Sequence, residues 1–128
     1  MRPLMFSKIV VGTDGSETAA RAVARAVDLA SGFDAELVVV NVHGPRDESR
    51  GRRVIEEVEK LHAGSARIRG VLRSGHPADA LADVADEEKA DLIVVGNKGM
   101  TGVSRFLGSV PNSISHQAPT HVLIVRTT

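Results

Sequence analysis

The chain has 128 residues, and 16 lysine and arginine residues balance 16 aspartate and glutamate residues, so its formal net charge is zero. This balance argues against nucleic acid as a main partner, because proteins that bind polyanions normally carry a clear positive excess. The chain has no cysteine, tryptophan or tyrosine, which excludes disulfides, thiol catalysis, cysteine zinc sites and a tyrosine or tryptophan stacking platform for bases.

Five short apolar runs predict β-strands. Most of them are continuous and rich in β-branched residues, which is typical of strands buried on both faces of a parallel sheet. The third run differs, because arginines alternate along it at positions 67, 69 and 73, so we expect a half-exposed edge strand there. In chain order the runs are 9–11, 37–42 (interrupted by Asn41), 68–72, 92–95 and 122–125.

Apolar residues at helical spacing lie between these runs and predict four helices. We expect Gly32 to stop the first helix, Pro77 to begin the third and Pro119 to end the last. The segment 44–51 is expected to be a flexible loop. The apolar stripes are Ala19, Val23, Ala26, Val27 and Ala30; Val54, Ile55, Val58, Leu61 and His62; Leu81, Val84 and Ala85; and Val110, Ile114 and Ala118.

Strands and helices alternate along the chain, which predicts a single-domain, doubly wound α/β fold over residues 1–128 with a mostly parallel sheet. Right-handed crossovers place helices on both faces of such a sheet. Ligands bind outside the carboxyl ends of its strands, near the point where the strand order reverses. The segments that follow the first, second and fourth strands are therefore the candidate ligand-binding segments.

The segment after the fourth strand has the clearest ligand-binding pattern. Four of the 12 glycines lie within residues 96–108, and glycine allows successive backbone N–H groups to point at an anion. Ser109 and Val110 then open the last helix, whose first N–H groups favour negative charge. No acidic residue follows Asp91, and Lys98 is placed to reach a terminal phosphate. The alternative is a glycine-rich connection without a ligand.

Other chemistry has little support in the sequence. Neither G-x-x-x-x-G-K-[ST] nor G-x-G-x-x-G occurs after a strand, which argues against a P-loop and a classical dinucleotide site. The histidines lack the spacing of a metal site, and no nucleophile elbow supports a pairing of Ser109 with His116. We assign no catalytic residue and no metal ligand. The acidic residues Asp83, Asp86, Glu87 and Glu88 are interpreted as a solvated helix face.

Four motifs together resemble the nucleotide-binding branch of the universal stress protein family, and the whole chain is similar to its actinobacterial members. The resemblance covers essentially all residues and implies a five-stranded sheet in the order 3-2-1-4-5. It also implies a site for ATP or a related adenine nucleotide. The motifs are Val-Val-Gly-Thr-Asp-Gly-Ser at 10–16, Leu-Ile-Val-Val-Gly-Asn-Lys-Gly at 92–99, Leu-Gly-Ser-Val-Pro at 107–111 and Val-Leu-Ile-Val at 122–125.

The resemblance also implies roles for individual residues. Thr13 and Asp14, after Gly12, match the loop beside the ribose and base, and the backbone of Val42 matches the position that reads the adenine edge. Asp14 is expected to bind the nucleotide or an accompanying Mg²⁺. From the residues alone, Asp14, Ser16 or both could instead cap the first helix. The implied glycine motif, which holds phosphates and ribose, consists of Gly96, Gly99, Gly108 and Ser109.

One spacing departs from the family pattern, which is read as G-x2-G-x9-G-[ST]. Here eight residues, Met100 to Leu107, separate Gly99 from Gly108. A shorter arm favours a smaller phosphate group, so ATP, cyclic AMP and AMP all remain candidate ligands. The leading function is a dimeric adenine-nucleotide-binding module in stress response or signalling. The alternatives are a slow ATPase and a protein-interaction member of the family that binds no nucleotide.

The two edges of the expected sheet differ in charge. Arginines at positions 67, 69 and 73 discourage pairing along the third strand, whereas residues 122–125 carry no charge. We therefore expect a homodimer in which the 122–125 strands of two copies pair antiparallel, and the resemblance implies the same arrangement. No apolar run reaches the ~18 residues of a membrane span and no signal-peptide pattern occurs, so we expect a cytoplasmic protein without a membrane partner.

Overall fold

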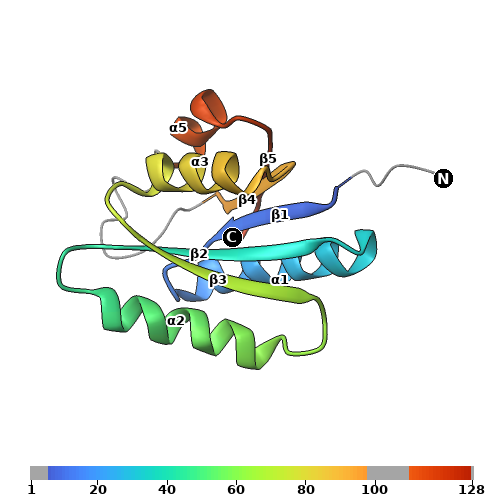
Figure 1. The fold of residues 1–128 in the computed structure, drawn as a ribbon, viewed down its shortest axis with the longest axis horizontal. Coiled ribbons are helices and arrows are strands. Elements are labelled where there is room, and N and C mark those ends of the chain that lie inside the picture. Colours follow the sequence, from blue (N-terminus) through green and yellow to red (C-terminus); the bar gives the residue numbers. More distant parts are fainter. Residues whose placement is uncertain (1–5, 98–109, 128) are drawn as a thin grey trace.

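The computed structural model describes residues 6–97 and 110–127, which form a five-stranded sheet in the order β3-β2-β1-β4-β5 (Figure 1). All neighbouring strands are parallel. The predicted α/β fold and strand order are therefore confirmed. The strands are β1 (Lys8–Gly12), β2 (Glu36–His43), β3 (Arg67–Ser74), β4 (Leu92–Gly96) and β5 (His121–Val125).

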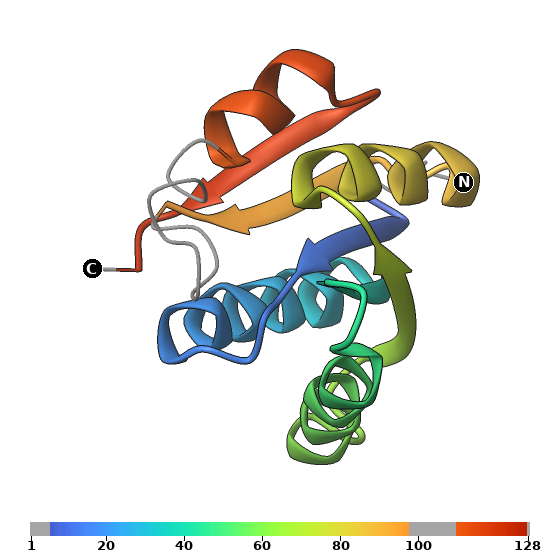
Figure 2. The ribbon, with the colours of Figure 1, turned by 90° about the vertical axis from the view of Figure 1, so that its left-hand side faces the viewer.

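Helices cover both faces of the sheet (Figure 2). Successive side chains of a strand point to opposite faces, so Ile9 and Val11 of β1 pack with α1, whereas Val10 packs with α3 and α5. The three central strands are almost completely buried and consist mainly of valine, isoleucine and leucine. The described helices are α1 (Glu17–Phe33), α2 (Glu48–Leu61), α3 (Pro77–Glu88) and α5 (Val110–Gln117).

Two predicted helix limits are wrong. Helix α1 continues through Gly32 and ends at Asp34, whose φ of 55° places it in the left-handed region and lets its N–H reach the carbonyls of Ala30 and Ser31. Helix α2 begins at Glu48, so half of the segment predicted as a loop is helical. The start of this helix was not recognised in the sequence, because the charged residues of its first turn face solvent and resemble those of a loop.

The apolar stripe predicted for α2 is only partly a core stripe. Ile55 is buried, and Val54 and Val58 are half-buried, but the side chain of Leu61 is 77% exposed. Gly51 is buried instead. Glycine is needed there because a Cβ would collide with the side-chain oxygen of Asn41 on β2. The absence of a side chain at Gly51 thus lets the helix approach the sheet closely. Hydrophobic periodicity does not reveal a contact of this kind.

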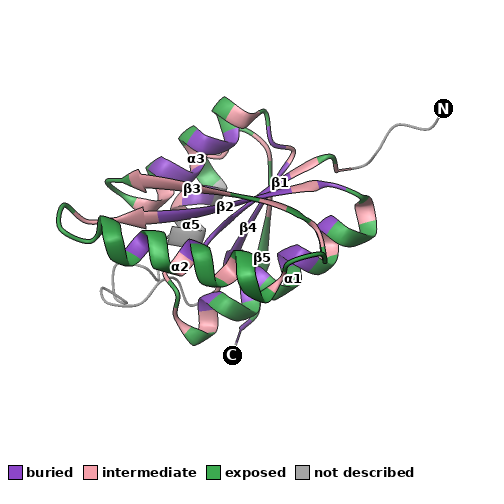
Figure 3. Cartoon of the chain, turned by 60° about the horizontal axis from the view of Figure 1, so that its bottom comes forward, coloured by how far each residue is buried: buried purple, intermediate pink, exposed green. Residues whose placement is uncertain are grey.

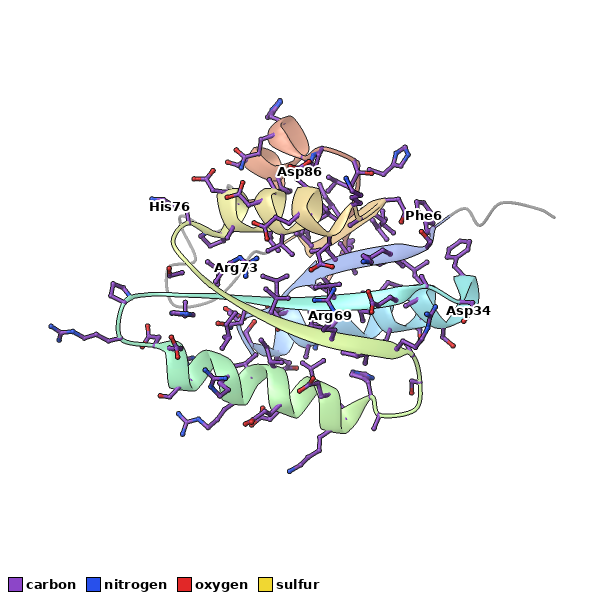
Figure 4. All side chains as sticks on the ribbon, in the orientation of Figure 1. Phe6, Asp34, Arg69, Arg73, His76 and Asp86 are labelled. Carbon is purple, nitrogen blue, oxygen red and sulfur yellow. The ribbon has the colours of Figure 1, made fainter. Side chains whose placement is uncertain are left out.

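The arginines of β3 are engaged in ion pairs, and two of them, Arg69 and Arg73, are labelled in Figure 4. Arg69 pairs with Glu88 at the end of α3 and with Glu36 of β2, the latter at 3.7 Å. Lys8 of β1 lies 3.3 Å from Glu88 and 3.5 Å from Glu36, so four charges of alternating sign form one network. Arg73 pairs with Glu87. Asp83, Asp86 and Glu87 are exposed, as predicted for a solvated face, whereas Glu88 is half-buried and joins α3 to the strands.

The opposite edge strand, β5, is apolar and partly uncovered (Figure 3). Leu123 and Ile124 are 37% and 45% exposed, and β4 is the only strand that pairs with β5 among the described residues. Within the described part of the chain, no helix combines the length and apolar character needed to cross a bilayer.

Candidate functional site

The candidate site lies where β1 and β4 end side by side. These neighbouring strands continue to opposite faces of the sheet, β1 into α1 and β4 toward α5, which makes their carboxyl ends the switch point of the fold. Gly12 ends β1, Gly96 ends β4, and Val42 lies near the end of β2, the other neighbour of β1. The fold therefore brings these three predicted residues to one edge of the sheet.

The turn after β1 is fixed by its own polar groups. The N–H of Thr13 donates to the carbonyl of Val40 at 2.9 Å, which extends the pairing with β2. The Thr13 hydroxyl accepts from the N–H of Gly15 at 3.1 Å, and the Asp14 carboxylate accepts from the N–H of Ser16 at 2.9 Å. Gly15 has a φ of 84°, a conformation that favours glycine. Thr13 and Asp14 are thus held by hydrogen bonds within the turn itself.

Ser16, not Asp14, caps helix α1. The Ser16 hydroxyl accepts from the N–H of Ala19 at 3.1 Å, which is the usual geometry of an N-cap. Asp14 lies two residues before the cap, and its carboxylate holds the preceding turn instead. Of the helix caps that the sequence left open, the structure therefore selects Ser16. Asp14 is half-buried and lies between the carboxyl end of β1 and the N-cap of α1.

Asn41 of β2 supports the turn that follows β1. It was not among the site residues predicted from the sequence. Its side chain is buried, and its amide donates to the carbonyl of Thr13 at 3.0 Å. Its oxygen has no hydrogen-bond partner among the described residues and faces Gly51 of α2. The available signal was a single polar residue that interrupts the apolar run 37–42. Such an interruption in a buried strand indicates a specific partner.

The end of β2 contributes Val42 and His43. Val42 is half-buried and packs against the cluster on the α3 side of the sheet, while its backbone lies opposite Arg73 of β3. His43 Nδ1 lies 2.8 Å from the carbonyl of Gly44. A carbonyl can only accept a hydrogen bond, so Nδ1 carries the proton in this contact.

Residues at the end of β4 are held by the C-terminus of the chain. The side-chain oxygen of Asn97 accepts from both the N–H and the hydroxyl of Thr127, at 2.8 and 3.0 Å. A Cβ on Gly96 would lie 3.3 Å from the Thr127 methyl group, so little room exists for a side chain there. Neither Asn97 nor Thr127 was predicted as part of the site.

Lys98, Gly99, Gly108 and Ser109 lie outside the described residues, and Val110 is the first residue of α5. Residues 6–97 and 110–127 contain no group of three or more histidine, aspartate or glutamate side chains arranged to hold a metal ion. The described part of the site thus consists of the turn after β1, the end of β2 and the end of β4.

Comparisons with known proteins give a consistent result. The sequence model of the universal stress protein family matches residues 5–126. A universal stress protein of Mycobacterium tuberculosis is 39% identical over 144 residues, which cover 96% of this chain and 98% of the relative. One from Thermus aquaticus is 38% identical over 137 residues, with 95% and 100% covered. A solved universal stress protein in complex with cAMP is 35% identical with a TM-score of 0.82, covering 96% of this chain and 99% of its own.

Proposed function

The chain belongs to the universal stress protein family, and from this premise we propose that it binds an adenine nucleotide, preferably cyclic AMP, at the carboxyl edge of its sheet. The observation that carries the proposal is the turn at Thr13 and Asp14, which is held rigidly at the switch point beside the ends of β2 and β4. Hydrogen bonds of this kind limit the conformational freedom that the turn would lose when a ligand binds.

The chemistry of the edge suits a nucleotide. Val42 offers backbone groups to a base, and aliphatic side chains can pack on its faces, so no tryptophan or tyrosine is required. The segment after β4 supplies glycines, Lys98 and the start of α5, and this part of the chain has no acidic residues. These are the groups that bind phosphate oxygens. We expect Asp14 to contribute at the ribose or at a Mg²⁺ that accompanies ATP.

Two observations favour cyclic AMP over ATP. Eight residues separate Gly99 from Gly108, one fewer than in the family pattern, so the phosphate-binding arm is shorter. A relative that is 35% identical over nearly the whole chain was solved in complex with cAMP. A cyclic monophosphate needs less space than a triphosphate. ATP binding with higher affinity than cyclic AMP would contradict this preference but not the nucleotide site itself.

We also propose that the protein is a homodimer that uses β5. Leu123 and Ile124 are large apolar side chains that are partly exposed on an edge strand. An uncovered apolar edge strand is an aggregation hazard, and antiparallel pairing with a second copy covers it in a closed two-fold dimer. The dimer would act as a nucleotide-responsive module in stress response or signalling, without an enzymatic step.

The proposed ligand can be sought on the purified protein itself. The chain lacks tryptophan and tyrosine, so a co-purified nucleotide would dominate the ultraviolet spectrum of the denatured sample. Chromatography of the supernatant against AMP, cyclic AMP and ATP standards would identify it. Adenine nucleotide in stoichiometric amount supports the proposal. A sample without bound nucleotide that also fails to take up added cyclic AMP or ATP contradicts it.

A further inference from the structure

We infer that Thr127 is a positioning residue of the nucleotide site, because it fixes the point from which the glycine-containing segment departs. This inference rests on the proposed nucleotide-binding function. It concerns three side chains from distant parts of the chain, Arg21 of α1, Asn97 after β4 and Thr127 near the C-terminus, which we call the C-terminal clamp. None of the three is one of the motif residues Gly96, Gly99, Gly108 and Ser109, although Asn97 lies between the first two glycines.

Hydrogen bonds inside the clamp converge on Thr127 and Asn97. The Thr127 N–H and hydroxyl both donate to the Asn97 side-chain oxygen, at 2.8 and 3.0 Å. The Asn97 N–H donates to the carbonyl of Val125 at 2.9 Å. Asn97 is thus held through its backbone by one residue of the C-terminal segment and through its side chain by another. Its position is therefore set by the last residue of β5 through the backbone and by Thr127, which follows β5, through the side chain.

Thr127 is itself anchored and inaccessible to solvent. It is 3% exposed, and its carbonyl accepts from the Arg21 guanidinium at 2.6 Å. Arg21 is oriented in turn by Glu17, at 2.9 Å within the first turns of α1. A buried hydroxyl that lost its partner would leave an unsatisfied polar atom, so the arrangement resists displacement.

The position of the clamp in the fold gives it a role beyond holding the C-terminal segment in place. Asn97 is followed directly by Lys98 and Gly99, so a shift of Asn97 is passed to the first residues of the proposed phosphate-binding segment. Arg21 lies on the helix that Ser16 caps, directly after the turn of Thr13 and Asp14. The clamp therefore sets the loops after β1 and β4 relative to each other. A ligand that spans both loops depends on that relation.

Gly96 shows how closely the C-terminal segment approaches. A Cβ at this position would lie 3.3 Å from the Thr127 methyl group and 3.7 Å from the Cβ of Ala22. The methyl group therefore packs against the end of β4 while the hydroxyl reaches Asn97. Both parts of the threonine side chain are used, and each can be removed separately by substitution.

The test compares Thr127→Val, which keeps the shape but removes the hydroxyl donor, with Thr127→Ser, which keeps the hydroxyl and removes the methyl group. Thr120→Val, at the opposite end of β5, is the matched control. Cyclic AMP affinity is measured by calorimetry together with the melting temperature. We expect Thr127→Val to weaken binding about fivefold, the effect of one lost hydrogen bond, while Thr127→Ser and the control stay within about twofold of the wild type.

Hydrogen exchange of the backbone at Gly96 and Asn97, measured without nucleotide, gives a second and independent readout. We expect faster exchange in Thr127→Val and wild-type rates in Thr127→Ser. Wild-type affinity and exchange in Thr127→Val would overturn the inference and leave the proposed function intact. A wild-type protein that binds no nucleotide would overturn the positioning role along with the proposed function, and the exchange data would then report only whether the clamp orders this segment.

Discussion

The side-chain amide of Asn41 donates a hydrogen bond to the backbone carbonyl of Thr13 at 3.0 Å, and so joins the second strand to the turn that follows the first. The same side chain lies against Gly51, so helix α2, strand β2 and the candidate site meet at one buried asparagine. The packing of α2 and the shape of the site are therefore linked through Asn41. The packing of α2 against Asn41 can be tested by substituting Gly51, which is not a residue of the site.

Gly51→Ala is expected to destabilise the protein by about 1–3 kcal/mol, because the new methyl group collides with the Asn41 oxygen and Leu72. Gly32→Ala is the matched control, since Gly32 is also helical but has nothing within 4 Å of an added Cβ. The control should gain up to about 1 kcal/mol from helix propensity. Urea denaturation measures both. Equal stability changes in the two variants would contradict the described seating of α2.

Ile124→Lys is expected to separate the proposed dimer, because it would place a lysine charge from each copy in the apolar interface between the two β5 strands. Light scattering should report a monomer, or aggregates if the exposed Leu123 remains uncovered. Arg69→Ser changes the opposite edge strand and should leave the dimer mass unchanged. A dimer that persists in Ile124→Lys would show that β5 is not the interface.

The charge network at the end of α3 predicts a loss of stability at acidic pH. The hydrogen bond from Arg69, assisted by Lys8, holds the pKa of the Glu88 carboxyl below its ordinary value. Because the pKa of Glu88 is lower in the folded state, the stabilisation of the fold by this carboxylate is complete above the ordinary glutamate pKa of about 4.3. It is lost as the pH falls through the folded-state pKa.

Glu88→Gln should therefore reduce the free energy of unfolding at neutral pH by about 1 kcal/mol or less, since the pair is partly exposed. Below the folded pKa of Glu88 the variant and the wild type should converge. Urea denaturation between about pH 7 and pH 3 measures this. Glu57→Gln, an exposed position of α2, is the control. If the difference in unfolding free energy between Glu88→Gln and the wild type stays constant over this range, the lowered pKa of Glu88 is refuted.

Lys98→Ala is expected to weaken ATP more than AMP, because the lysine charge would meet the outer phosphates. Roughly a fivefold loss for ATP and a loss within about twofold for AMP would fit one charge-assisted contact in a partly hydrated site. Lys60→Ala, at the far end of α2, controls for the change in net charge. Calorimetry that finds equal losses for both nucleotides would reject this role for Lys98.

The order of elements could be predicted because each strand and helix has a local signature. The valine-rich run at 37–42 and the alternating arginines of β3 identified a central and an edge strand correctly. Helix ends were harder, because Asp34 ends α1 in a left-handed conformation that usually belongs to glycine, while the nearby Gly32 is an ordinary helical residue. The actual stop depends on hydrogen bonds to Ala30 and Ser31, which the local composition does not specify.

The candidate site was predictable only where motifs mark it. Thr13 and Asp14 belong to a conspicuous turn sequence, whereas Asn41 and Thr127 act through partners 28 and 30 positions away. Such contacts depend on how strands are aligned and on where the C-terminal segment passes, and neither follows from residue spacing. The role of the glycine motif itself, at Gly99, Gly108 and Ser109, remains a prediction.

Calorimetric titration of the nucleotide-free protein with cyclic AMP tests the central claim most directly. We predict saturable binding of one nucleotide per chain, with ATP competing for the same site and binding more weakly. Saturable binding of ATP alone would keep the nucleotide site and overturn the preference for cyclic AMP. The absence of binding heat and of thermal stabilisation with both nucleotides would contradict the account and favour a family member that acts through protein contacts alone.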